Sequence, residues 1–128
     1  LENNHSNRSF VLFLPENEIH ELGILYLHYE LSLRGHKSIY LGQSVPIENL
    51  EPLIGSSDEI DFIAYATVEP AKEKIDRYLK VFSKKILEKK PAKFSILGFQ
   101  TQFIDIKTIP NNIYTFRGFE ELITGLHL

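Results

Sequence analysis

The sequence predicts an α/β protein with a flavodoxin-like or Rossmann-like three-layer sandwich, built around a five-stranded parallel sheet in the order 2-1-3-4-5. Two observations predict this fold class. Short apolar segments alternate with helical patterns along the chain. The first of these segments is apolar at every position, as in strands that are covered on both faces. The length of 128 residues suits one domain with its own hydrophobic core.

The first strand is predicted at Phe10 to Leu14, because Pro15 stops this apolar run. A helix is predicted from Glu18 to Leu33, with Gly35 placed to end it. Its apolar stripe at helical spacing comprises Ile19, Leu22, Tyr26, Tyr29 and Leu33. Further apolar residues lie largely off this stripe, namely Ile24, Leu25, Leu27 and Leu31. One sheet face cannot cover them all, so we expect this helix to be buried against a second surface as well.

The other elements continue the alternation. Further strands are predicted at residues 38–41, 62–66, 94–97 and 113–116. A short helix is predicted after Pro46, a long helix from Pro70 to Lys89, and a closing helix at residues 119–126. The long helix has an apolar stripe made of Ile75, Leu79, Phe82 and Ile86. Its basic outer face contains interspersed acidic residues, so we expect a solvated face with charge pairs one turn apart.

Composition excludes several function classes. The net charge of −3 does not favour direct binding of DNA or RNA, which usually needs clustered Lys and Arg. Cysteine is absent, which excludes disulfides, thiol catalysis and Cys-based metal sites. No apolar run is long enough to span a membrane and the start does not resemble a signal peptide, so we expect a cytoplasmic protein.

The start of the chain differs in character from the rest. Residues 1–9 are polar and aperiodic and are predicted to be a linker or an expression remnant. The domain is predicted to span residues 10–128, because the first apolar segment begins at Phe10. The sequence has no Met, even at position 1, so we expect a domain excised from a longer protein.

Ligands of this fold bind beyond the carboxyl ends of the strands, near the point where the strand order reverses. The loops at that edge are predicted at residues 15–20, 67–70 and 98–102. The first loop has no glycine and has two glutamates where a pyrophosphate would lie, which argues against a dinucleotide and against a flavodoxin phosphate loop. The third strand ends without the Asp that a phosphoacceptor receiver domain requires.

The first loop instead contains Glu18-Ile19-His20-Glu21-Leu22-Gly23, in which a carboxylate precedes a His by two residues and a Gly follows it by three. This pattern resembles the Asp-x-His-x-x-Gly motif of cobalamin-binding domains, with Glu18 in the Asp position. The flanking sequence resembles the C-terminal domain of MerR-type transcriptional regulators of the cobalamin-dependent, light-sensing kind. The resemblance is specific over residues 11–50 and lies at the level of the fold beyond them.

The resemblance implies that His20 is the lower axial ligand of cobalt in base-off cobalamin, in place of the cofactor's own benzimidazole. Glu18 would hydrogen-bond the other imidazole nitrogen and raise the basicity of the ring, as carboxylates do behind metal-bound histidines generally. Gly23 would let the start of the helix approach the nucleotide tail of the cofactor, which descends into a slot beside the sheet.

The later motifs of the family correspond here to Thr67-Val68-Glu69 and Gly98-Phe99. The resemblance implies that Thr67 supplies a hydroxyl to the tail, with Val68 beside it, whereas Glu69 stands where the family often has Leu. Gly98 would line the slot. Phe99 replaces a second glycine of the family, and its ring would either stack on the benzimidazole or fill its place.

From the resemblance we expect a noncatalytic, ligand-sensing domain of a MerR-like regulator that binds cobalamin. Its expected partners are the helical-bundle and DNA-binding domains of the full-length protein and further copies of that protein in a homo-oligomer. Ligand binding would change how the domain packs against them. Two alternatives remain open. One is a degenerate interaction module of the same regulator, with Phe99 closing the slot and a role in oligomerisation. The other is a cobalamin-carrying domain of a methyltransferase or mutase.

Overall fold

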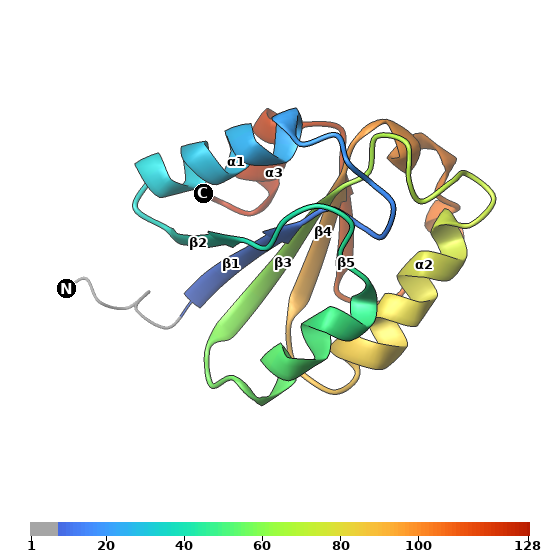
Figure 1. The fold of residues 1–128 in the computed structure, drawn as a ribbon, viewed down its shortest axis with the longest axis horizontal. Coiled ribbons are helices and arrows are strands. Elements are labelled where there is room, and N and C mark those ends of the chain that lie inside the picture. Colours follow the sequence, from blue (N-terminus) through green and yellow to red (C-terminus); the bar gives the residue numbers. More distant parts are fainter. Residues whose placement is uncertain (1–7) are drawn as a thin grey trace.

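The computed structural model describes residues 8–128 and has a five-stranded parallel sheet in the order β2-β1-β3-β4-β5 between two helical layers (Figure 1). The strands are β1 Arg8–Phe13, β2 Lys37–Tyr40, β3 Glu59–Tyr65, β4 Lys93–Leu97 and β5 Ile113–Phe116. Helices α1 (Leu22–Leu33) and α3 (Phe119–Gly125) cover one face of the sheet. Helix α2 (Ile75–Phe82) and a 3-10 helix at Ile47–Gly55 cover the other. The predicted fold class and strand order are confirmed.

The central strands are apolar at nearly every position because each of their faces contributes to a separate core. On the α1 side, Leu12 lies in one buried cluster with Ile24. On the α2 side, Phe13 lies in the other cluster and stacks on Phe82, with ring centroids 6.2 Å apart. Phe82 in turn stacks on Phe94 of β4 at 3.9 Å.

Strand β1 begins at Arg8, two residues before the predicted start of the domain. Arg8 and Ser9 pair with the first residues of β3, and the Arg8 guanidinium forms an ion pair with buried Asp61 at 2.6 Å. Sheet pairing therefore places Arg8 and Ser9 inside the domain, although their side chains are polar. Residues 1–7 of the predicted linker lie outside the described residues.

Helix α1 begins at Leu22, not at Glu18, and the predicted apolar stripe lies on the wrong face. The side chains that pack on the sheet are Ile24, Leu27 and Leu31. All members of the predicted stripe are more than half exposed, namely Ile19, Leu22, Tyr26, Tyr29 and Leu33. The helix is apolar around most of its circumference, so spacing alone does not identify the buried face.

The long predicted helix is shorter than expected and changes its geometry. Helix α2 begins at Ile75, and a π-helical turn at Ser83–Leu87 follows it. In this turn the N–H of Glu88 donates to the carbonyl of Ser83 at 2.8 Å. The predicted stripe is buried as expected, at Ile75, Leu79, Phe82 and Ile86.

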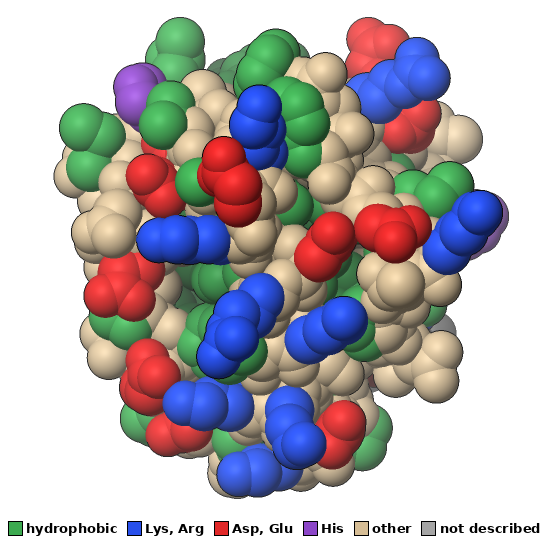
Figure 2. All heavy atoms as spheres, turned by 90° about the vertical axis from the view of Figure 1, so that its right-hand side faces the viewer, with side chains coloured by type: hydrophobic (Ala, Val, Ile, Leu, Met, Phe, Trp, Pro, Cys, Tyr) green, Lys and Arg blue, Asp and Glu red, His purple; other side chains and the backbone are tan. Residues whose placement is uncertain are grey.

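The outer surface of the α2 layer carries both signs of charge, with Lys and Arg side chains interspersed with Asp and Glu (Figure 2). Lys85 pairs with Glu48 at 3.0 Å, which agrees with the predicted solvated and paired face. Lys90 differs from its basic neighbours, because it is buried and donates to the carbonyl of Ser56 at 2.8 Å. Among the described residues, no helix is both long enough and apolar enough to cross a membrane.

Candidate functional site

The three loops predicted to form a site meet at the carboxyl edge of the sheet. Glu18 of the first loop bonds the backbone of the second, at Thr67, Val68 and Glu69. Gln100 of the third loop also bonds the second. Its N–H donates to the carbonyl of Ala66 at 3.0 Å, and its side-chain amide donates to the carbonyl of Pro70 at 3.1 Å. The loops that follow β1, β3 and β4 are therefore joined by polar contacts.

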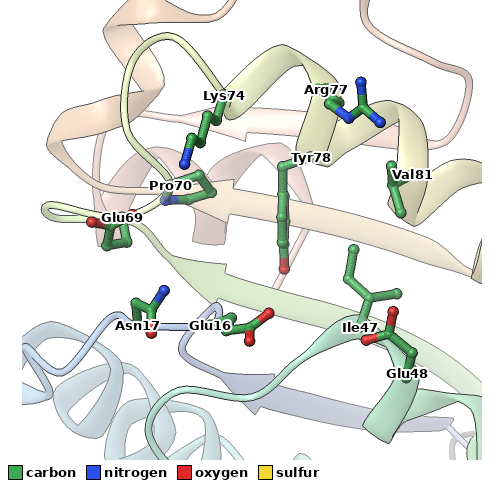
Figure 3. Close-up of a pocket in the computed structure, with 10 residues that line it drawn as sticks. All are labelled: Glu16, Asn17, Ile47, Glu48, Glu69, Pro70, Lys74, Arg77, Tyr78 and Val81. Carbon is green, nitrogen blue, oxygen red and sulfur yellow. The ribbon is translucent and has the colours of Figure 1, made fainter.

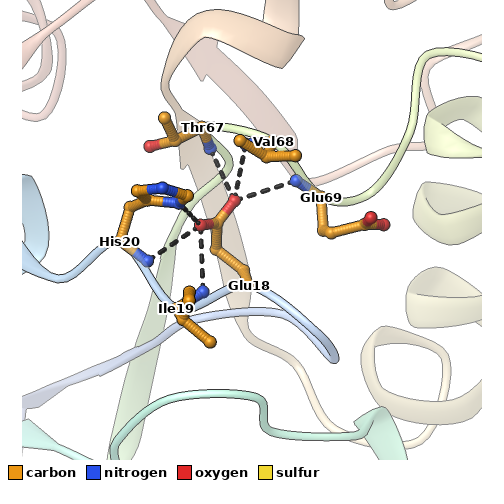
Figure 4. A network of polar contacts seen from close by, with 6 residues as sticks. All are labelled: Glu18, Ile19, His20, Thr67, Val68 and Glu69. Carbon is orange, nitrogen blue, oxygen red and sulfur yellow. Dashed lines mark hydrogen bonds and ion pairs between the residues drawn. The ribbon is translucent and has the colours of Figure 1, made fainter.

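Glu18 is the centre of this arrangement (Figure 4). Its side chain is fully buried. One carboxylate oxygen accepts hydrogen bonds from three consecutive N–H groups, those of Thr67 at 2.9 Å, Val68 at 2.7 Å and Glu69 at 2.9 Å. The other oxygen accepts from the N–H groups of Ile19 at 3.0 Å and His20 at 2.9 Å. We call this set of contacts the Glu18 clamp.

The Glu18 clamp keeps its carboxylate ionised. Burial by itself would raise the pKa of Glu18, but the N–H groups of Glu69, Val68 and His20, together with the His20 ring, lower it to about 2. Successive backbone N–H groups that converge on one point form a concavity that favours an anion. Here the chain's own carboxylate occupies that concavity, which fixes the first loop against the second.

His20 is oriented by the same carboxylate. Its Nδ1 lies 2.7 Å from the second carboxylate oxygen of Glu18. Because an ionised carboxylate can only accept a hydrogen bond, Nδ1 carries the hydrogen and the lone pair of the neutral ring lies on Nε2. The His20 side chain is 55% exposed, so the structure presents a ring of defined tautomer at the surface.

Both glycines predicted to line a cofactor slot face atoms of the chain itself. A Cβ added to Gly23 would lie 2.7 Å from Cζ of Tyr65, at the end of β3. Gly98 has a φ of +109°, and a Cβ there would lie 2.5 Å from the carbonyl oxygen of Ala66. Each glycine therefore permits a close approach within the protein.

The other predicted site residues lie around the Glu18 clamp. Thr67 is partly exposed and Val68 is exposed, and the backbone N–H of each belongs to the clamp. Phe99 is 64% exposed and meets Phe103 edge to face, with centroids 6.0 Å apart. Its ring therefore does not fill a space inside the described chain. We call Ile19, Val68 and Phe99, the exposed apolar side chains of the three loops, the apolar rim.

A cavity of about 440 Å³ lies on the α2 side of the same loops (Figure 3). Its lining includes none of the predicted site residues. Lys74, Arg77 and Tyr78 line one side, with Glu16 and Glu69 on the loops opposite. Burial raises the pKa of Tyr78, whose hydroxyl lacks a hydrogen-bond partner among the described residues. Sequence reasoning missed this cavity because its residues come from separate segments without a spacing motif.

No protein-family model matches the sequence, and no curated protein matches it significantly. Solved structures with the same α/β fold do match. One is the monomethylamine corrinoid protein of Methanosarcina barkeri, with a TM-score of 0.72 and 16% identity over 98% of this chain and 59% of that one. Another is described as a novel cobalamin-binding protein from Desulfitobacterium hafniense DCB-2, with a TM-score of 0.65 and 13% identity over 94% of this chain and 58% of that one. At these identities the likeness establishes the fold, and this chain spans less than two thirds of either neighbour.

Proposed function

We propose that this chain is a noncatalytic sensory domain that binds a cobalamin-type corrinoid, with His20 as a ligand to cobalt. The observation that carries the proposal is the Glu18–His20 pair, in which a buried, ionised carboxylate directs the lone pair of an exposed imidazole to Nε2. A carboxylate in this position orients a metal-binding His and raises its basicity. The names of the two fold neighbours, a cobalamin-binding and a corrinoid protein, support the same ligand class.

The residues at this end of the site fit a corrinoid. Imidazole nitrogen suits transition metals of intermediate softness, and the corrin ring would supply the other nitrogen ligands itself. When bound, the corrinoid would supply a cobalt centre that can exchange one ligand for another. In the chain, His20 would bind the metal and Glu18 would hold the His20 imidazole in place. The apolar rim would offer an uncharged surface to the macrocycle.

The outer face of α1 supports the further proposal that the domain belongs to a MerR-like transcriptional regulator. Leu22, Tyr26, Tyr29 and Leu33 make this face apolar and exposed, and it begins two residues after His20. Contiguous apolar surface is typical of interaction sites. We propose that a helical bundle of a longer, oligomeric, cytoplasmic protein covers it, with the DNA-binding domain elsewhere in that protein. A ligand that favours one packing arrangement over another would then control DNA binding.

The experiment that tests cobalt ligation uses hydroxocobinamide, a corrinoid that has no nucleotide base of its own. Any imidazole ligation in its visible spectrum must therefore come from the protein. We expect the chain to produce an imidazole-ligated spectrum and His20→Ala to abolish it. His127→Ala is the matched control, because His127 is also exposed and should leave the spectrum unchanged. An imidazole-ligated spectrum that survives His20→Ala would contradict the assignment.

A second candidate function is a corrinoid-carrying domain of a methyltransferase, which the name of the Methanosarcina barkeri neighbour favours. A sensor must change its assembly when it binds the ligand, whereas a carrier need not. Sedimentation of the longer protein with and without corrinoid separates the two, since only a sensor should change its oligomeric state. If no corrinoid binds, the interaction-module alternative becomes the better account.

A further inference from the structure

Tyr65 fills the space in front of Gly23. The glycine lies in the first turn of α1, and Cζ and Cε2 of Tyr65 lie 2.7 and 2.8 Å from the position that a Cβ there would occupy. Tyr65 is the last residue of β3, lies on the α1 side of the sheet and packs against the cluster that contains Ile24 and Leu97. Its ring therefore closes the gap between the sheet and the start of α1, next to the loops that carry His20.

The segment of residues 97–100, at the end of β4, holds the residue after Tyr65 in place. The backbone of Gly98 lies so close to Ala66 that a Cβ would approach the Ala66 nitrogen, carbon and oxygen to within 2.8 Å. The N–H of Ala66 donates to the carbonyl of Leu97 at 2.7 Å, and its carbonyl accepts from Gln100 at 3.0 Å. Ala66, the residue after Tyr65, is thus fixed to the segment of residues 97–100, and a Cβ at either glycine would collide with atoms of the chain itself.

The metal-binding end of the site has a separate support. His20 is positioned by Glu18, whose partners are the backbone of residues 19–20 and 67–69 and the His20 ring. Tyr65 takes no part in that set of contacts. A change at Tyr65 can therefore alter the space beside Gly23 while the orientation of His20 is kept.

We propose that Tyr65 determines ligand specificity, so that the domain binds a corrin ring without a nucleotide tail in preference to intact cobalamin. This inference rests on the proposed function. A tail placed beside Gly23 requires the Tyr65 ring to leave its packed position. Losing the burial of an aromatic side chain should weaken binding by roughly 10- to 100-fold. A corrin ring that has no nucleotide tail needs only His20 and the exposed surface around it.

The test compares hydroxocobinamide with hydroxocobalamin, using equilibrium dialysis for affinity and the visible spectrum for His20 ligation. The unmodified chain should bind cobinamide at least about 10-fold more tightly than cobalamin. Tyr65→Ala removes the ring and should tighten cobalamin binding by about the same factor, while cobinamide affinity changes less than about 3-fold. Tyr65→Phe keeps the ring and is the matched control, so it should behave as the unmodified chain does.

Each outcome decides the matter. Equal affinities of the unmodified chain for the two ligands would overturn the inference and leave the proposed function intact, and this comparison needs no variant to fold. Unchanged cobalamin affinity in a Tyr65→Ala protein that retains its circular dichroism spectrum would also overturn it. If no variant binds either corrinoid with a His20-dependent spectrum, the proposed function itself fails and the inference falls with it.

Discussion

The two helical layers of this protein cover the same sheet but have different outer surfaces. Helix α2 buries one apolar stripe and turns a mixed-charge surface to water (Figure 2). Helix α1 buries Ile24, Leu27 and Leu31, yet its outer face is also apolar. The α2 layer thus has the surface of a helix exposed to water, whereas the α1 layer has the surface of a helix that is covered on both sides. His20 lies two residues before α1, so the uncovered apolar surface begins close to the proposed cobalt ligand.

The largest effect that should distinguish the layers comes from deleting an aromatic ring in each. Phe82→Ala should lower the free energy of unfolding by about 3–5 kcal/mol, because the ring is fully buried and stacks on Phe94. Tyr26→Ala on the outer face of α1 should cost only about 1 kcal/mol, since that ring is half exposed and its one aromatic contact among the described residues is edge to face with Phe119. Urea unfolding measures both. Equal losses would contradict the distinction between the layers.

The next effect concerns stability in acid. The Glu18 clamp joins the loop that precedes α1 to the loop that precedes α2. The pKa of Glu18 is about 2 in the folded chain against an ordinary value of 4.5, so ionised Glu18 stabilises the folded state. This contribution, about 3 kcal/mol, should be complete above pH 4.5 and be lost as the pH falls toward 2. Unfolding free energies measured across that range check the prediction.

Two variants, Glu18→Gln and Glu16→Gln, test whether the Glu18 clamp is the source of this acid dependence. In Glu18→Gln one carboxylate oxygen becomes an amide group that donates, so it must face backbone N–H donors, and we expect a loss of about 2–4 kcal/mol near pH 7. The free energy of unfolding of Glu18→Gln should also depend less on pH between 4.5 and 2. Glu16→Gln is the control, because it changes an exposed carboxylate two residues away that is not part of the clamp. The loss of stability between pH 4.5 and 2 should remain in this variant. A profile in Glu18→Gln that remains as steep as that of the unmodified chain would contradict the role of the clamp.

The smallest effect on stability should come from the outer face of α1. Leu22 is 85% exposed, so Leu22→Gln should change the unfolding free energy by less than about 0.5 kcal/mol. In the longer protein the same change should alter the sedimentation behaviour, because it removes apolar surface from the proposed contact with the helical bundle. A clear loss of stability would show instead that the isolated chain already uses this face in its own packing.

The two layers also show how far sequence reasoning reaches. In α2 the apolar and charged positions contrast, and the stripe predicted from spacing is the buried one. In α1 there is little contrast, and the buried face could not be identified because nearly every face is apolar. The sheet order followed from the alternation of elements, since topological rules leave few arrangements for such a pattern.

The contacts of the candidate site were likewise predictable only in part. The resemblance to the cobalamin-binding motif implied that Glu18 pairs with His20, and the structure brings His20 Nδ1 to 2.7 Å from the Glu18 carboxylate. The bonds from Glu18 to residues 67–69 could not be predicted, because backbone N–H groups have no signature in a sequence. Tyr65 was missed for a related reason. An aromatic residue fills a particular space only through the three-dimensional approach of strand and helix, and Phe99 was the more conspicuous candidate in the motif.

The Glu18 clamp has a consequence for how this protein can vary. Its contacts across the loops are made with main-chain N–H groups, so the side chains at positions 67–69 take no part in holding the first loop. Every amino acid except proline offers such a donor. Substitutions at these positions can therefore change what the loop presents to a ligand while the geometry of His20 is preserved. The side chains that can vary and the imidazole that Glu18 orients lie on two different loops, so the first can change without displacing the second.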